Sequence, residues 1–101
     1  DNEASETATV VEASGRDRTG LLAGLARTLS DAGLLITSAH IDGYGERAVD
    51  AFYVVDAQGQ KLTDARKRNA LRAALLSTLN DSEADPGERR TLQRARASVA
   101  R

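Results

Sequence analysis

The sequence contains no cysteine, methionine or tryptophan and only one proline. The absence of cysteine excludes disulfides, thiolate metal sites and cysteine nucleophiles, and it favours a reducing compartment, so we expect a cytoplasmic protein. No apolar run approaches the roughly 18 residues that a membrane span needs, and no signal-peptide pattern opens the chain, so we expect no membrane contact. The 101 residues fit one small domain. Because the chain lacks methionine and begins with Asp1, we expect it to be a piece of a longer protein.

Aromatic residues are scarce as well, and the three that occur are Tyr44, Phe52 and Tyr53. Charge is uneven along the chain, because residues 61–101 carry 10 basic and 5 acidic side chains and residues 1–60 carry 4 and 10. A basic half is compatible with a nucleic-acid partner. Proteins that bind single-stranded nucleic acid stack its bases on aromatic side chains, which this chain lacks, so we expect no nucleic-acid partner.

Hydrophobic periodicity divides the chain into five predicted elements between two polar ends. These elements are a strand over 7–14, a helix over 21–32, strands over 34–43 and 48–55, and a helix over 64–79. We therefore assign residues 7–79 to one domain and residues 1–6 to a flexible segment. Residues 80–101 are assigned to a charged tail that is disordered or forms a short helix after Pro86.

The order strand, helix, strand, strand, helix is typical of the ferredoxin-like α+β fold, whose full plan is βαββαβ. We expect an antiparallel sheet with two helices on one face and with the last strand weak or absent. An absent last strand would leave a sheet edge open, which predicts pairing with a second domain. In the strand over 34–43 the apolar side changes, and a bulge near Thr37–Ser38 would restore a single buried face.

The strand over 48–55 is apolar on both faces, so we expect it to be central, with helices on one face and a partner on the other. Asp50 interrupts its apolar run, and we expect this carboxylate to pair with Arg47 or with a partner chain. In the helix over 64–79, Thr63 is the predicted N-cap. The side chains predicted to face inward are Leu71, Ala74, Leu75 and Leu79.

A turn bracketed by Gly15 and Gly20 joins the first strand to the first helix. Free backbone N–H groups and the positive end of the helix dipole meet at such a place, which suits a carboxylate. Asp17 is the predicted N-cap, with Thr19 as a competitor, and its carboxylate is also a candidate contact for an ammonium group. Gly33 fits the position after the helix end. This pattern favours a sensor over a catalyst.

The chain resembles the ACT family, small amino-acid-sensing domains of ferredoxin-like fold, in Gly15–Leu22 and in Ala32–Ile36. It is similar to the C-terminal ACT domain of the bifunctional uridylyltransferase/uridylyl-removing enzymes in Ser38–Ile41 and in Tyr44–Val54. The resemblance implies that the domain senses glutamine and shifts the balance between uridylylation and deuridylylation of the nitrogen-signalling protein P-II.

The resemblance also implies partners and cofactors. The partners would be a small amino acid, another ACT domain in a homodimer or an intramolecular tandem, and P-II through the parent enzyme. The fragment itself would be no enzyme, would have no catalytic residue and would hold no cofactor or metal. Nucleotidyltransferase and metal-dependent hydrolase domains, for which Mg²⁺ is expected, would lie upstream.

Ligand positions in ACT domains fall in the loop after the first strand and at the start of the second strand. Carried over to this sequence, they are Arg16, Asp17, Arg18, Thr19, Gly20, Leu21, Leu35, Ile36 and Thr37. Thr19 stands where the family usually has proline, and Leu35 stands where it commonly has asparagine or aspartate. The change at Leu35 predicts weak glutamine binding or a polar group supplied by a partner domain.

A second hypothesis is an ACT-type interaction or dimerisation module that binds no ligand, which the substitution at Leu35 favours. A third is an RNA-binding ferredoxin-like domain that uses the basic second helix, although the sheet lacks the aromatic residues this requires. Catalysis is disfavoured, because Ser14 and Ser38 have no base and acid arranged around them and His40 is the single histidine. The glycine-bracketed turn is neither a P-loop nor a dinucleotide fingerprint.

Overall fold

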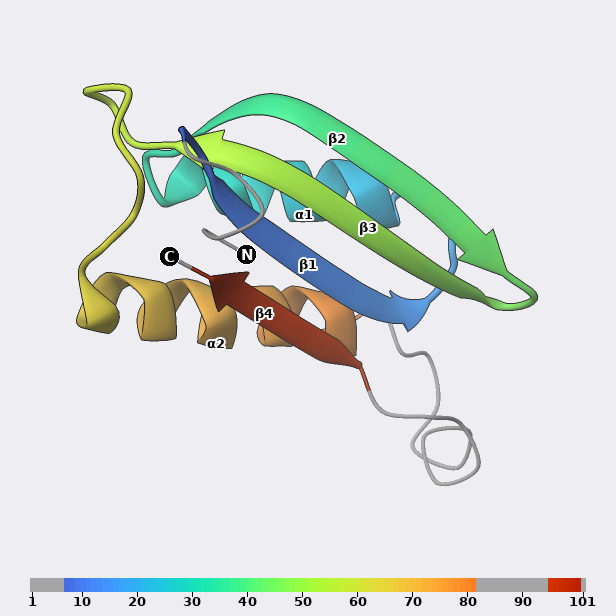
Figure 1. Cartoon of the computed structure of the whole chain (residues 1–101). Coiled ribbons are helices and arrows are strands. Elements are labelled where there is room, and N and C mark those ends of the chain that lie inside the picture. Colours follow the sequence, from blue (N-terminus) through green and yellow to red (C-terminus); the bar gives the residue numbers. More distant parts are fainter. Residues whose placement is uncertain (1–6, 82–94, 101) are drawn as a thin grey trace.

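The computed structural model describes residues 7–81 and 95–100. They form a four-stranded antiparallel sheet with two helices on one face (Figure 1). The strand order is β2-β3-β1-β4. In chain order the elements are β1 (Thr9–Arg16), α1 (Leu21–Asp31), β2 (Leu35–Tyr44), β3 (Arg47–Val55), α2 (Ala65–Asp81) and β4 (Arg96–Ala100). The predicted ferredoxin-like α+β class is confirmed.

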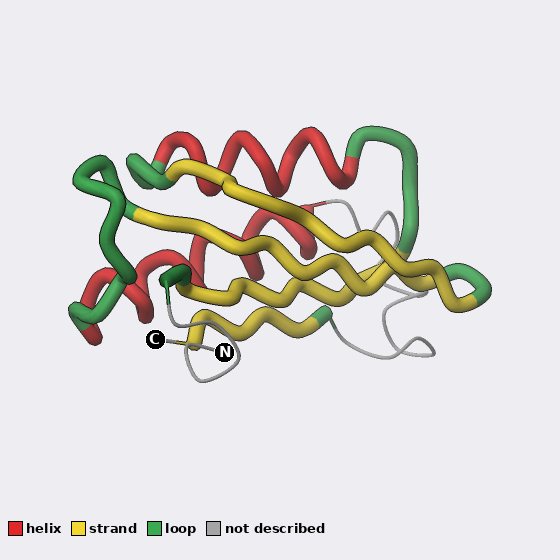
Figure 2. The backbone as a smooth tube through the Cα atoms, turned by 45° about the horizontal axis from the view of Figure 1, so that its top comes forward, coloured by secondary structure: helices red, strands yellow, loops and turns green. Residues whose placement is uncertain are grey.

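β3 and β1 lie side by side at the centre of the sheet (Figure 2), in register from Arg16 opposite Arg47 to Thr9 opposite Val54. Residues at even positions of β3 are buried and residues at odd positions are half-buried. The predicted central position of this strand is therefore confirmed. Both helices pack on one face of the sheet (Figure 1), as predicted, and cover of the other face by a partner stays a prediction.

The core between the sheet and the helices is built from leucines spaced four residues apart, which share one face of a helix. α1 and α2 each contribute three of them to the cluster around Phe52, and these are Leu21, Leu25, Leu29, Leu71, Leu75 and Leu79. Ala74 was predicted to face inward but is exposed, because it falls beside this leucine stripe. The two helices also meet through the hydroxyls of Thr28 and Thr78, whose oxygens lie 2.6 Å apart.

The prediction that the last strand is weak or absent is wrong, because Arg96–Ala100 forms β4 and pairs antiparallel with β1. Within β4 the side chain of Ala97 is buried, so a short alternation among small residues is enough to make an edge strand. The second helix, predicted over 64–79, spans Ala65–Asp81. The predicted flexible segment over 1–6 and the predicted helix after Pro86 lie outside the described residues.

β2 is the other edge strand, and its predicted bulge is confirmed by a register shift between Ile36 and Ser38. The bulge was expected to restore a buried face, and this expectation is wrong, because all ten residues of β2 are exposed. Leu35 is 58% exposed and Ile41 is 51% exposed. The edge strand β2 is therefore exposed along its whole length although it carries large apolar residues, because no other part of the described chain covers it.

The helix ends differ from prediction at two of the three positions considered. α1 begins after Gly20, whose φ is +86°, and no side chain caps it, so neither Asp17 nor Thr19 is the N-cap. For α2 the predicted cap Thr63 is replaced by Asp64, whose Oδ1 accepts a hydrogen bond from the Arg66 N–H at 2.9 Å. Gly33, with φ +81°, follows the end of α1 as predicted.

Candidate functional site

The β1–α1 loop, residues 17–20, is shorter than the predicted turn because β1 continues through Gly15 and Arg16. The loop is anchored at both ends by backbone hydrogen bonds. The N–H of Asp17 donates to the carbonyl of Glu46 at 2.6 Å, and the N–H of Leu21 donates to the carbonyl of Arg18 at 3.2 Å. The loop is therefore held against the turn between β2 and β3 and can present its groups in a fixed arrangement.

The N-terminus of α1 is open to an external acceptor. Gly20 has no side chain to offer as a cap, and the first turn of α1 contains no acidic residue. The first N–H groups of a helix have no partner within the helix, and the dipole places partial positive charge there. A small carboxylate is the kind of group that this position binds.

Arg18 and Arg16 differ in their environment. Arg18 is half-buried, its Nη1 donates to the carbonyl of Thr19 at 3.0 Å, and its Nε is buried without a hydrogen-bond partner. Arg16 ends β1 opposite Arg47. Arg18 is thus folded back along its own loop, and Arg16 belongs to the sheet.

Asp50 is a residue of this region that the sequence reasoning flagged without giving it a site role. Its side chain is only 2% exposed, and its Oδ1 accepts no hydrogen bond. Burial raises the pKa of the Asp50 carboxyl, and the nearby charge of Asp17 raises it further. The predicted pairing with Arg47 is not formed, because residues three apart in a strand point to opposite faces. The signal in the sequence was a single acid within an apolar strand.

The residues predicted at the start of the second strand lie far from the β1–α1 loop. Leu35 pairs with Val55 at the far end of β3, whereas the loop follows Arg16, which pairs with the first residue of β3. The length of β3, at about 3.3 Å per residue, places the two groups about 26 Å apart. Thr37 uses its hydroxyl to donate to the carbonyl of Tyr53 at 3.0 Å. A single chain therefore does not bring the two predicted halves of the site together.

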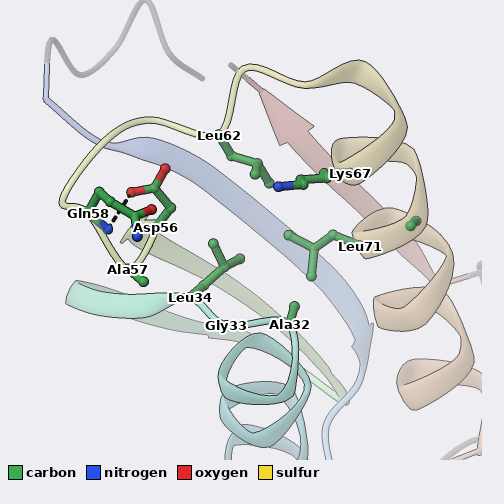
Figure 3. Close-up of a pocket in the computed structure, with 10 residues that line it drawn as sticks. Ala32, Gly33, Leu34, Asp56, Ala57, Gln58, Leu62, Lys67 and Leu71 are labelled. Atoms are coloured by element: carbon green, nitrogen blue, oxygen red, sulfur yellow. Dashed lines mark hydrogen bonds between the residues drawn. The ribbon is translucent and has the colours of Figure 1, made fainter.

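A cavity of about 360 Å³, which the sequence did not predict, opens at that far end, where α1 ends and β2 begins (Figure 3). Its apolar wall includes Leu34, Leu62 and Leu71, and the side chain of Lys67 extends across it toward Leu62 (Figure 3). Asp56 lines the opposite side, where its Oδ1 accepts hydrogen bonds from two backbone N–H groups of its own loop. That carboxylate serves to shape the loop.

Comparison with known families decides what this fold is. Residues 4–81 match the family model described as the ACR family N-terminal ACT domain. The chain belongs to the ACT family. The predicted resemblance is thereby confirmed, and the β1–α1 loop lies within Gly15–Leu22, one of the segments on which the resemblance was based.

The ACT domain is similar to one segment of longer bacterial proteins. It is 80% identical over 103 residues to a bifunctional uridylyltransferase/uridylyl-removing enzyme of Phenylobacterium zucineum (strain HLK1), matching 100% of this chain and 11% of that protein. It is 67% identical over 102 residues to the enzyme of the same name from Caulobacter vibrioides (strain NA1000 / CB15N), again over 100% of this chain and 11% of the relative. The chain thus spans about a tenth of the length of these relatives.

Solved structures support the fold alone, since their sequence identities are low. An ACT domain protein from Streptococcus pneumoniae superposes with a TM-score of 0.62 and 15% identity, over 90% of this chain and 84% of that one. A formyltetrahydrofolate deformylase from Pseudomonas putida KT2440 superposes with a TM-score of 0.64 and 12% identity, over 92% of this chain and 28% of that one.

Other site types find little support in the part of the chain that the structure describes. Within residues 7–81 and 95–100, no three His, Cys, Asp or Glu side chains are grouped to hold a metal ion, and neither helix is long and apolar enough to cross a membrane. His40 lies exposed on β2, and its ring packs edge-on against that of Tyr53 at 5.8 Å. The basic stretch of α2 consists of Arg66, Lys67, Arg68 and Arg72. Within it, Arg72 donates a hydrogen bond to the carbonyl of Ala97 in β4.

Proposed function

We propose that this ACT domain binds glutamine and thereby regulates the uridylyltransferase and uridylyl-removing activities of a longer protein that acts on P-II. The observation that carries the proposal is the uncapped N-terminus of α1, next to a loop that is fixed by hydrogen bonds. The names of the relatives supply the parent activity. The placement of this domain as the last ACT domain of that protein stays a prediction.

The N–H of Leu21 is bonded to the Arg18 carbonyl, so the carboxylate of the amino acid accepts hydrogen bonds from the next N–H groups of the first turn of α1, those of Leu22 and Ala23. The exposed carboxylate of Asp17 lies beside its ammonium group. The side-chain amide of glutamine contacts Thr37. Because Thr37 lies at the far end of the sheet, it comes from a second ACT domain. The apolar and exposed β2 of each domain supports such a pair.

Regulation follows from linkage between the ligand and the arrangement of the pair. A ligand shifts an equilibrium only by the difference in its affinity for the two states. Glutamine that contacts two domains binds one arrangement better than another, and the catalytic domains sense that difference. The ACT domain itself uses no cofactor in this proposal, and the Mg²⁺ implied by the family serves catalytic domains elsewhere in the longer protein.

Calorimetric titration of the 101-residue chain with glutamine and with glutamate tests the proposal. We expect saturable binding of glutamine that glutamate does not reproduce. Asp17→Ala should weaken this binding about tenfold, as expected for loss of a charge-assisted contact, without lowering thermal stability, since Asp17 does not cap α1. Asp31→Ala, which removes an exposed carboxylate at the other end of α1, is the matched control.

The competing function is a docking module without a ligand, which the exposed Leu35 favours. In that case neither amino acid gives heat in the titration, whereas the chain still self-associates. Sedimentation at increasing concentration, with and without glutamine, separates the two functions, because only the sensor gives an association that depends on the ligand.

A further inference from the structure

Asp50 sits on the helix-covered face of the sheet, close to the end from which the β1–α1 loop departs. It pairs with Ala13 of β1, and the next pair on the same face toward the loop is Ala48 with Gly15. Residues directly opposite each other in antiparallel strands share a face. The carboxyl group is therefore flanked, on the side of the loop, by three of the smallest residues available.

Two polar side chains of the described residues are buried, and only one of them is satisfied. Thr9 is fully buried, and its Oγ1 accepts a hydrogen bond from the Leu62 N–H at 2.7 Å. Asp50 is buried to a similar extent, yet its Oδ1 has no partner. Burying a carboxylate without a partner is strongly unfavourable, so a partner outside the chain is the simplest explanation.

The charge around Asp50 defines the partner as a cation. Asp17 is close enough to act electrostatically on the Asp50 carboxyl, and its effect is to raise the pKa. Arg47 lies on the other face of the sheet, and Arg18 donates to its own loop. Two neighbouring carboxyl groups of like charge, exposed Asp17 and buried Asp50, attract a compact cation with several N–H donors, such as an ammonium group.

We propose that Asp50 is the buried acceptor for the ammonium group of the amino acid whose carboxylate lies at the N-terminus of α1. The inference rests on the proposed function and adds a named contact to it. Asp17 guides the ammonium group in at the surface, and Asp50 binds it below. The ligand then connects the start of α1 to the middle of β3, two elements that the sequence separates.

The test uses Asp50→Asn and two ligands in calorimetric titrations of the 101-residue chain. The ligands are glutamine and glutaramic acid, which has the carboxylate and the side-chain amide of glutamine but no ammonium group. Asp50→Asn should weaken glutamine binding about tenfold or more, the range for a charge-assisted hydrogen bond. It should change the binding of glutaramic acid less than about twofold. Asp31→Asn removes one exposed carboxylate at the other end of α1 and should change neither affinity.

Each other outcome overturns a different statement. Equal weakening of both ligands shows that Asp50 acts through packing, and unchanged glutamine binding shows that it makes no contact, so either result removes the inference and leaves the sensor standing. Absence of glutamine binding by the unaltered chain removes the proposed function and this inference together. Asp50→Ser, which is smaller and also uncharged, repeats the test if the asparagine variant does not fold.

Discussion

Arg72 of α2 donates a hydrogen bond from its Nε to the carbonyl oxygen of Ala97 in β4, at 3.0 Å. This contact joins the second helix to the edge strand that completes the sheet. Because the guanidinium of Arg72 is used in this contact, at least one charge of the basic stretch of α2 has a structural role. The fourth strand therefore depends on a side chain 25 residues earlier in the chain.

Arg72→Ala should loosen β4 selectively. We expect a loss of about 1 kcal/mol in the free energy of unfolding, the usual range for one hydrogen bond from a charged donor at a partly exposed site. Amide hydrogen exchange should accelerate at residues 96–100 and stay unchanged in β3. Arg66→Ala, at an exposed position of the same helix, is the control. Equal exchange rates in β4 of the two variants would contradict the role given to Arg72.

Gly20→Ala should lower stability and disturb the site. Gly20 has φ +86°, a conformation that costs a residue with a Cβ atom roughly 1 kcal/mol. The same change at Gly43 is the control, because its φ is not in the left-handed region and a Cβ there meets no other atom within 4 Å. Chemical denaturation should show the loss for Gly20→Ala alone, and glutamine affinity should fall with it. A loss of equal size at Gly43 would mean that backbone strain is not the cause.

Asp50→Asn should stabilise the domain at neutral pH. The pKa of Asp50 is raised in the folded state, so the protonated form favours folding. That contribution is complete below the pKa of the unfolded chain, about 3.9, and is lost as the pH rises through the folded pKa. The asparagine variant has no such loss. Its stability advantage over the original chain should be near zero at about pH 3 and should grow toward neutral pH, by about 1.4 kcal/mol for each pH unit that separates the unfolded and folded pKa values of Asp50.

Unfolding curves of both proteins across this pH range measure the difference, and the carboxylates that the proteins share cancel from it. An advantage that does not change with pH would show that Asp50 is not destabilised by its burial. A lower stability of the variant at neutral pH would show that Asp50 already has a partner within the chain.

Leu35→Asn should tighten glutamine binding, because the family commonly places a polar residue there. Leu35 is 58% exposed, so the change removes little buried surface and should leave stability unchanged. One additional neutral hydrogen bond corresponds to about a fivefold gain in affinity. Tyr44→Asn, at an exposed position of the same strand, controls for the loss of apolar surface from β2. If Leu35→Asn and the original chain bind glutamine equally in calorimetry, this position is not part of the site.

The sequence was sufficient for the elements whose signal is local. Leucines spaced by four residues predicted both helices, and a run around Phe52 that is apolar on both faces predicted the central strand. The change of apolar side near Thr37 predicted the bulge of β2, because a pleated strand can restore its face only by an extra residue. Gly33 marked the end of α1, because the residue after a helix end often has a positive φ, which glycine adopts most easily.

What failed depended on contacts between distant segments. β4 has no long apolar run, and it is recognisable only once Ala97 is buried beside β1 and Arg72 reaches it. The cap of α1 was assigned to Asp17, whereas β1 continues through Arg16, the helix begins at Leu21 as predicted, and its N-cap is Gly20, which has no side chain to offer. The role of Asp50 could not be derived either, since its isolation follows from which face of β3 the helices cover.

Amide NMR of the 101-residue chain during titration with glutamine tests most directly whether this ACT domain senses glutamine at the start of α1. We predict saturable shifts that cluster at residues 17–23 and at Asp50, with glutamate producing none of them. Shifts confined to the far end of the sheet, around Leu34 and Lys67, would place the ligand in the cavity at that end and contradict the proposed site. Absence of shifts anywhere would leave this ACT domain as a docking module.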